Sequence, residues 1–290
     1  MFKGSIVALV TPFRDGKFDE KAYGDLIDWH VSQGTHGIVP CGTTGEASTL
    51  GFDEHFRVIE VAVKAANGRI PVIAGTGANA TDEAIELTAK AKELGADGAL
   101  LVTPYYNKPT QEGLYRHYKA VAEAVDIPIL LYNVPGRTAV NLLPSTVARL
   151  TEFKNIVGIK EATADLRQVS DLLRLCGNRM LVLSGDDFTT LPLLSLGGHG
   201  SISVTANVAP KEAAELYNAW QRGDIAKARE IHFSLEPVNA AMFLETNPIP
   251  VKTAVAMMGR CTEEFRLPLC EISPANREKL QLVLREAGII

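Results

Sequence analysis

The residue in this sequence best suited to covalent chemistry is Lys160, which ends an apolar run that begins at Ile156. A β-strand seldom directs an ammonium group into a protein interior, because burial disfavours the charged form of an amine. A neutral amine can attack a carbonyl carbon and form a Schiff base. In the alternative interpretation, Lys160 emerges at the strand end and extends its amine to water. Periodicity alone leaves both interpretations open.

Further polar side chains follow other apolar runs. The segment Gly42-Thr43-Thr44-Gly45-Glu46 combines glycines with hydroxyls and amides that can converge on an anion such as a carboxylate. Comparable polar segments are Thr103–Asn107, Tyr132–Thr138, Ser184–Asp187 and Ser201–Thr205. Each alone has an ordinary structural interpretation, such as a helix cap or a solvated charge, because short motifs match by chance.

Eight short runs rich in Val, Ile and Leu recur along the chain, at about 5–11, 37–41, 70–75, 98–103, 128–133, 156–160, 180–184 and 201–205. Amphipathic stretches separate most of them, at 53–66, 81–94, 110–125, 144–150, 165–175 and 209–221. Continuously apolar strands that alternate with helices predict a parallel sheet covered by helices, and eight such units can close a barrel. We therefore predict an α/β fold, a (β/α)8 TIM barrel over residues 1–223. The polar segments then gather at the carboxyl ends of the strands, where such barrels build active sites.

Residues 224–290 are predicted to form a C-terminal helical extension. Helical patterns occur at about 224–243, 250–258 and 274–287, and proline-containing segments interrupt them. No low-complexity linker precedes the extension, so we expect it to pack on the barrel.

The composition is that of an ordinary globular protein. It is 46% hydrophobic and 22% charged with a net charge of −5, which provides no basic face for nucleic acid. The apolar segment near the N-terminus is too short for a signal peptide, and no stretch approaches the ~20 apolar residues of a membrane span. Four cysteines without a CxxC pair suit a reducing compartment, so a cytoplasmic location is expected. The histidines show no metal-ligand spacing, and we predict neither a metal nor another cofactor.

Two glycine-rich segments compete as binding motifs. Gly75–Ala80 fits the G-x-G-x-x-A pattern of dinucleotide sites, but Asp97 precedes the next strand, whereas the ribose-binding acid should follow it. Leu196–Gly200 leads into the last strand and therefore belongs at the opposite end of the barrel. Neither segment is predicted to bind a ligand.

Taken together, three motifs resemble those of the pyruvate-dependent class I aldolase and lyase family. They are Gly42–Glu46, Tyr132–Thr138 and Gly158–Thr163, and the resemblance extends from Gly4 nearly to the C-terminus. It implies a Schiff-base-forming lyase in which Lys160 forms an imine with pyruvate. The resulting enamine would attack L-aspartate 4-semialdehyde, in a step of diaminopimelate and lysine biosynthesis.

The resemblance also implies roles for individual residues. Tyr132, Thr43 and Tyr106 would form a proton relay with Lys160, and Thr44 and the Ile202 backbone would bind pyruvate, with Gly185 also assigned to substrate binding. Arg137 would bind the carboxylate of the semialdehyde through its fork of donors. In the family, Tyr106 completes a neighbouring subunit's site, so we expect a homotetramer built as a dimer of dimers.

Feedback inhibition by L-lysine is a further implication of the resemblance. The effector would bind at a subunit interface, separate from the catalytic site, to residues matching Ser48, His55, Asn79, Glu83 and Tyr105. Phe52 departs from the pattern, because a lysine-sensitive relative can carry histidine there.

Two other functions remain open at this level. N-acetylneuraminate lyases and sugar-acid aldolases share the imine lysine and the tyrosine, but Arg137 favours a short acidic aldehyde over a polyhydroxylated substrate. A non-catalytic binding paralogue is the other alternative. Loss of Lys160 or Tyr132 would favour it, and both are present.

Overall fold

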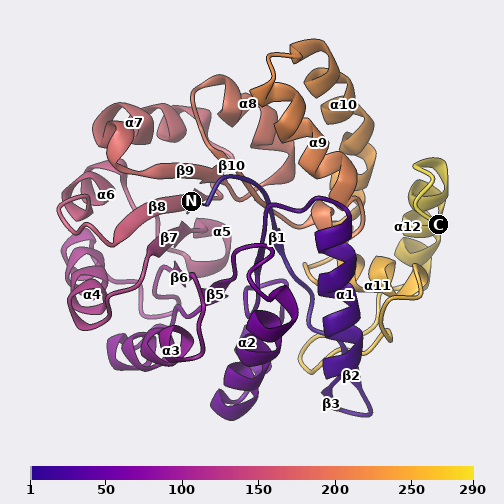
Figure 1. The fold of residues 1–290 in the computed structure, drawn as a ribbon, viewed down its shortest axis with the longest axis horizontal. Coiled ribbons are helices and arrows are strands. Elements are labelled where there is room, and N and C mark those ends of the chain that lie inside the picture. Colours follow the sequence, from indigo (N-terminus) through magenta and orange to yellow (C-terminus); the bar gives the residue numbers. More distant parts are fainter. Residues whose placement is uncertain (1) are drawn as a thin grey trace.

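The computed structural model describes residues 2–290, and its centre is a barrel of eight parallel strands (Figure 1). The strands are β1 (Gly4–Ala8), β4 (Gly37–Val39), β5 (Ile73–Gly75), β6 (Gly98–Val102), β7 (Ile129–Asn133), β8 (Ile156–Glu161), β9 (Leu181–Ser184) and β10 (Gly200–Ser203). Their order is β4-β1-β10-β9-β8-β7-β6-β5, and a parallel bridge between Ile38 and Val72 joins the two ends. The predicted TIM barrel is therefore confirmed.

Helices cover the outside of the barrel because the strands are apolar on both faces. They are α1 (Glu20–Ser32), α2 (Phe52–Ala66), α3 (Thr81–Glu93), α4 (Gln111–Ala124), α6 (Pro144–Leu150), α7 (Leu166–Cys176), α8 (Thr190–Ser195) and α9 (Pro210–Gln221). Inside the barrel, Ile6, Val39, Leu100, Leu130 and Ile202 form a buried layer that also includes Tyr132. This packed layer forms the floor beneath the polar ends of the strands.

Helix α1 and several short elements lie outside the predicted helices and strands. Helix α1 carries buried Tyr23, Leu26, Ile27 and His30 at helical spacing, and the Asp19 side chain caps its first turn by accepting from the Ala22 amide. That signal was present in the sequence and was overlooked. The hairpin of β2 (Phe13–Arg14) and β3 (Lys17–Phe18), the four-residue helix α5 (Pro135–Thr138) and α8 are too short to give a periodic pattern.

The C-terminal segment forms three helices, α10 (Ile225–Ala241), α11 (Ile249–Met257) and α12 (Pro274–Glu286). Helix α10 lies beside α9, and α11 lies beside α12 (Figure 1). Val251 and Val255 of α11 belong to the same buried cluster as Leu9 and Ile38 of the barrel region. The extension therefore packs on the barrel as expected, and the division at residue 223 stays a prediction.

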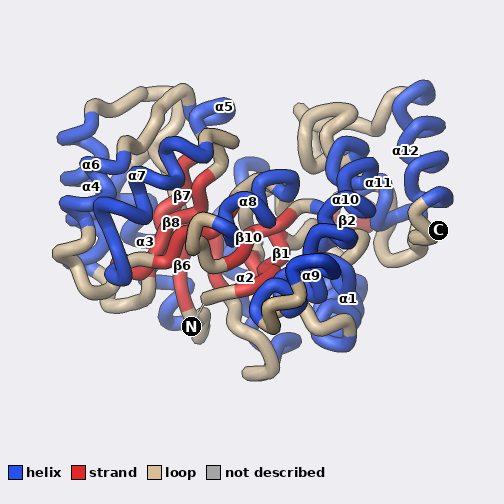
Figure 2. Tube along the Cα trace, turned by 90° about the horizontal axis from the view of Figure 1, so that it is seen from above, coloured by secondary structure: helices blue, strands red, loops and turns tan. Residues whose placement is uncertain are grey.

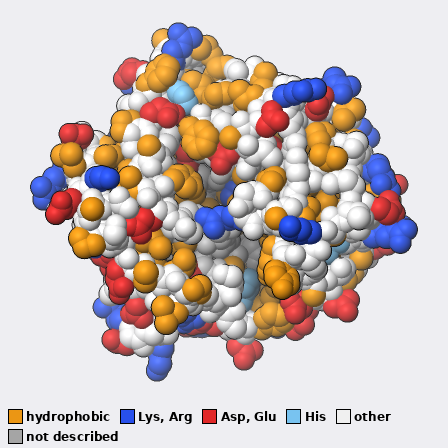
Figure 3. Space-filling model, turned by 180° about the vertical axis from the view of Figure 1, so that it is seen from behind, with side chains coloured by type: hydrophobic (Ala, Val, Ile, Leu, Met, Phe, Trp, Pro, Cys, Tyr) orange, Lys and Arg blue, Asp and Glu red, His pale blue; other side chains and the backbone are white. Residues whose placement is uncertain are grey.

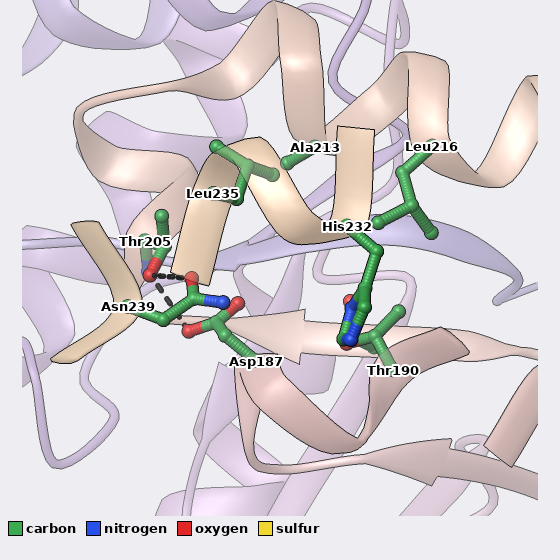
Figure 4. Close-up of a pocket in the computed structure, with 9 residues that line it drawn as sticks. Asp187, Thr190, Thr205, Ala213, Leu216, His232, Leu235 and Asn239 are labelled. Atoms are coloured by element: carbon green, nitrogen blue, oxygen red, sulfur yellow. Dashed lines mark hydrogen bonds between the residues drawn. The ribbon is translucent and has the colours of Figure 1, made fainter. Parts of the chain in front are cut away.

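A small polar cavity lies between α10 and the barrel (Figure 4). The Thr205 hydroxyl donates to Asn239 Oδ1 of α10 at 2.7 Å, and the Thr205 amide donates to Asp187 Oδ2 at 3.0 Å. The cavity measures about 20 Å³, which holds about one water molecule. It is too small for a metabolite, and the Thr205–Asn239 hydrogen bond joins α10 to the barrel.

The two ends of the barrel differ in what surrounds them. In Figure 2 the N-terminus lies at one end, and α5, which follows β7, lies at the other. Acidic and basic side chains are interspersed over the face seen in Figure 3.

Among the helices of residues 2–290, none combines the length and the apolar character needed to cross a membrane.

Candidate active site

Lys160 and Tyr132 face one another on neighbouring strands. They are paired in register across β8 and β7, so their side chains project to the same side of the sheet. Lys160 is 5% exposed and Tyr132 is 7% exposed, and Lys160 Nζ lies 4.2 Å from the centre of the tyrosine ring. Burial excludes the alternative in which Lys160 extends to water.

Gly185, at the end of β9, leaves the space that Lys160 occupies. A Cβ atom at this position would lie 2.5 Å from the Ala162 side chain, closer than real contacts allow, and 3.0 Å from Lys160 Cε, which is a tight contact. The next residue, Asp186, was given no role from the sequence. Burial raises its pKa, and the nearby Lys160 opposes that shift. Asp186 is thus an acidic group within electrostatic reach of the amine.

The loop after β4 carries Thr43 and Thr44. Its turn is closed by the Glu46 amide, which donates to the Thr43 carbonyl at 3.1 Å. Thr44 is 1% exposed, and across residues 2–290 neither the Thr43 nor the Thr44 amide has a hydrogen-bond partner. Unpartnered donors in a buried loop suit an anionic ligand, because an unmet amide costs free energy.

A buried ion pair joins this loop to helix α11. Lys252 Nζ of α11 lies 2.7 Å from Glu46 Oε1, and both side chains are 0% exposed. The second oxygen, Oε2, accepts from the Arg266 amide at 3.2 Å. Neither Lys252 nor Glu46 is among the site residues predicted from the sequence. A lysine inside the apolar run Ile249–Met257 was the available signal, since such a charge requires a buried partner.

Asn247 connects the loop to Arg137, and it too was missed. The Asn247 side-chain amide donates to Thr44 Oγ1 at 3.0 Å, and its main-chain carbonyl accepts from Arg137 Nη2 at 3.0 Å. Arg137 lies in α5, immediately after the strand that carries Tyr132. The extension thereby contacts both groups that were predicted to bind carboxylates.

One cavity of about 330 Å³ opens beside these residues, large enough for a small metabolite. Thr43, Tyr132 and Arg137 line it together with Phe52 and four of the residues predicted to bind lysine, namely Ser48, His55, Glu83 and Tyr105. The predicted catalytic and effector sites were expected to be separate, and in this chain some residues of each line the same cavity.

Several predicted residues lie outside that lining. The lining does not include Lys160, Thr44, Gly185 or Ile202, and Ile202 is 0% exposed within the barrel layer. Asn79 also lies outside, where its carbonyl accepts from Asn107 at 2.8 Å. Tyr106 is 91% exposed and has a φ of +73°. A bulky residue rarely adopts this backbone conformation because it costs conformational free energy. The surrounding turn must therefore stabilise it.

The predicted effector residues are partly engaged already. His55 Nε2 lies 2.8 Å from the Gly75 carbonyl, and burial lowers the pKa of this histidine, which favours the neutral ring. Burial and the adjacent Glu83 carboxylate both raise the pKa of Tyr105. Glu83 and Tyr105 therefore lie close enough for their charges to interact.

The glycines of the rejected dinucleotide motif have a packing role. A Cβ at Gly75 would lie 2.0 Å from the Cys41 carbonyl oxygen, and one at Gly77 would lie 2.3 Å from the Val102 amide nitrogen. Glycine is needed here because neighbouring strand ends approach closely.

Within residues 2–290, no group of three or more His, Cys, Asp or Glu side chains is arranged to hold a metal ion.

Comparison with known proteins identifies the family. The model of the dihydrodipicolinate synthetase family matches residues 1–287. The chain belongs to this family. It is 70% identical to the 4-hydroxy-tetrahydrodipicolinate synthase of Thermodesulfovibrio yellowstonii over 290 residues, 100% of both chains.

Solved structures of the family share the fold over the whole chain. A dihydrodipicolinate synthase from Acinetobacter baumannii, described as chloride inhibited and complexed with pyruvate, is 53% identical with a TM-score of 0.98 and 100% coverage of both chains. That of Cyanidioschyzon merolae, solved with lysine bound, is 39% identical with a TM-score of 0.97 and covers 100% of this chain and 99% of its own. The predicted family, fold and lyase activity are confirmed.

Proposed function

We propose that this protein condenses pyruvate with L-aspartate 4-semialdehyde to give 4-hydroxy-tetrahydrodipicolinate, for diaminopimelate and lysine biosynthesis. The observation that carries the mechanism is Lys160, buried against Tyr132, which lines one cavity with Thr43 of the loop that has unpartnered donors. The chain's relatives bear the name of this activity, and one was solved with pyruvate.

The amine of Lys160 attacks the C2 ketone of pyruvate, and loss of water leaves an imine. The protonated imine accepts electrons as a methyl proton leaves, which gives an enamine. Its carbon attacks the aldehyde and forms the new carbon–carbon bond. The amino group of the semialdehyde then displaces Lys160 from the imine carbon, closing the ring and freeing the lysine.

Each surrounding residue has a matching task in this proposal. Tyr132 moves protons at the imine, since its hydroxyl can both give and take one. The Thr44 hydroxyl and the Thr43 and Thr44 amides bind the pyruvate carboxylate, and Arg137 binds that of the semialdehyde. Arg137 lines the cavity and favours this substrate over a sugar acid.

Trapping tests the Schiff base directly. Incubation with pyruvate and borohydride should leave a reduced adduct on Lys160, located by peptide mass spectrometry. Lys252 is the internal control, because it is also buried but is paired with Glu46. A missing adduct, or one on Lys252, contradicts the mechanism. A coupled assay with pyruvate and the semialdehyde tests the substrate pair.

We further propose that Tyr106 completes the proton relay of a neighbouring subunit within a homotetramer. Its 91% exposure, outside the cavity of its own chain, supports this role. Specific activity should then fall on dilution as subunits dissociate. A fully active monomer in sedimentation would contradict the proposal.

Inhibition by L-lysine is proposed at the end of the cavity lined by Ser48, His55, Glu83 and Tyr105, with Asn79 nearby. Glu83 would pair with an ammonium group of the effector, and a relative solved with lysine bound supports the ligand class. Glu83→Gln should abolish inhibition while preserving activity without lysine. Unchanged activity of the wild-type protein at millimolar lysine would contradict the proposal.

A further inference from the structure

Asn247 lies at the junction between the C-terminal extension and both carboxylate-binding groups. It is 5% exposed and precedes α11, whose Lys252 is fixed by Glu46. Its side chain contacts Thr44 and its main chain contacts Arg137. We propose that Asn247 is a positioning residue that sets the direction of the Thr44 hydroxyl proton, and thereby prepares this hydroxyl to bind the pyruvate carboxylate.

The hydrogen-bonding capacity of the two side chains determines the direction of the Thr44 proton. A threonine hydroxyl has one proton to donate and two lone pairs that accept. Asn247 Nδ2 carries only donors, so its 3.0 Å bond to Thr44 Oγ1 occupies a lone pair and leaves the hydroxyl proton free. Thr44 is 1% exposed, so bulk water does not compete for that proton. A bound carboxylate then receives a hydroxyl that already points its proton outward.

The opposite orientation of the Asn247 amide would reverse the direction of the Thr44 hydroxyl proton. With oxygen and nitrogen exchanged, Thr44 would donate its proton to Asn247 and turn lone pairs toward the substrate. In the observed orientation Asn247 Oδ1 is buried and has no partner within residues 2–290. Once a carboxylate is bound, the observed orientation gives the Thr44 proton an acceptor, whereas the exchanged orientation would turn the Thr44 lone pairs toward an anion.

The inference rests on the proposed function, and Asn247→Asp tests it. The substitution keeps the shape but presents only acceptors, so Thr44 must donate to the new carboxylate. The pyruvate KM, and the pyruvate concentration that gives half-maximal borohydride trapping, should rise about 10- to 100-fold, the value of a hydrogen bond to a charged group. The KM for the semialdehyde should change far less, because the main-chain carbonyl that contacts Arg137 remains.

The pH dependence of the pyruvate KM provides a second measurement, and it would not change if the role of Asn247 were merely structural. Below the pKa of the introduced carboxyl group its proton can be donated to Thr44, so the ratio of variant to wild-type pyruvate KM should shrink as pH falls. In a Thr44→Val background, which has no hydroxyl to orient, most of the effect of Asn247→Asp should disappear.

Equal effects in both Thr44 backgrounds, or equal increases in the KM of both substrates, would overturn the inference. If Asn247→Asp does not fold, Asn247→Ser should show the same split between substrates at a smaller size, since serine cannot reach Thr44. A wild-type adduct on Lys160 together with an unchanged pyruvate KM in the variants overturns the role of Asn247 alone. Absence of the wild-type adduct overturns this role and the proposed function together.

Discussion

Lys160 and Lys252 are both buried, but among residues 2–290 only Lys252 has an acidic partner for its amine. Lys252 is 0% exposed, lies 2.7 Å from the Glu46 carboxylate, and has its ammonium 4.0 Å from the centre of the Phe13 ring. Lys160 is 5% exposed and lies over the Tyr132 ring, and across residues 2–290 it makes no hydrogen bond or ion pair. Burial alone therefore does not distinguish a reactive lysine from a structural one, and the partner does.

The pair at Lys252 has a clear physical consequence. Desolvation lowers the pKa of Lys252, and Glu46 opposes the shift through its charge and its hydrogen bond. A lysine engaged in this way cannot turn its lone pair toward a substrate. Lys160 keeps its amine unengaged beside Tyr132, which lines the cavity, and an unengaged amine is what nucleophilic catalysis requires.

The same substitution at both positions should separate the two roles. Lys160→Met should abolish the pyruvate adduct and lower kcat by on the order of 10³-fold or more, because the nucleophile is lost. Its free energy of unfolding should stay unchanged or rise, since an apolar side chain replaces a buried amine. Borohydride trapping, steady-state kinetics and denaturant unfolding check these outcomes. Retained turnover would break the comparison.

Tyr132→Phe tests the second difference between the two lysines, because Lys160 lies over a tyrosine and Lys252 lies over Phe13, which has no hydroxyl. Removal of the proton-transferring hydroxyl should lower kcat about 10²- to 10⁴-fold while the fold persists. Tyr118→Phe is the matched control, because Tyr118 is also buried and its hydroxyl donates only to the Leu101 carbonyl, at 3.3 Å. Near-normal kcat for Tyr132→Phe would remove the tyrosine from the mechanism.

Lys252→Met should act on stability. Removing one partner of a buried pair leaves the other charge uncompensated, which costs about 3–5 kcal/mol. The double variant Glu46→Gln with Lys252→Met should recover most of that loss, because no buried charge remains. Denaturant unfolding at one fixed protein concentration measures both. A double variant as unstable as the single one would show that packing around Lys252, not its charge, supplies the stability.

The barrel could be predicted from sequence because its information is local. Strands such as 98–102 are continuous apolar runs, and the helices that follow them have apolar residues at helical spacing. Lys160 could be identified because it interrupts such a run. Helix α1 could have been predicted from Asp19 and the buried positions that follow, whereas four-residue α5 could not.

The supports of the site could not be predicted in the same way. Glu46 and Lys252 are far apart in the chain, as are Thr44 and Asn247, and no period links them. Their contacts depend on how α11 packs against the barrel, which is a property of the assembled core. An apolar helix with one lysine indicates only that a partner exists, and the fold decides which acidic residue it is.

The smallest expected effect concerns a third lysine and tests whether burial, not distance, separates these pairs. Lys90 Nζ lies 2.8 Å from Glu93 Oε1 on the surface of α3, almost the distance of the Lys252 pair, but the two side chains are 35% and 69% exposed. Water already solvates these charges, so Lys90→Ala should change the free energy of unfolding by less than about 0.5 kcal/mol. Denaturant unfolding beside Lys252→Met measures the difference. A loss as large as that of Lys252→Met would mean that ion-pair distance sets the energy, and burial would no longer explain why Lys252 is structural.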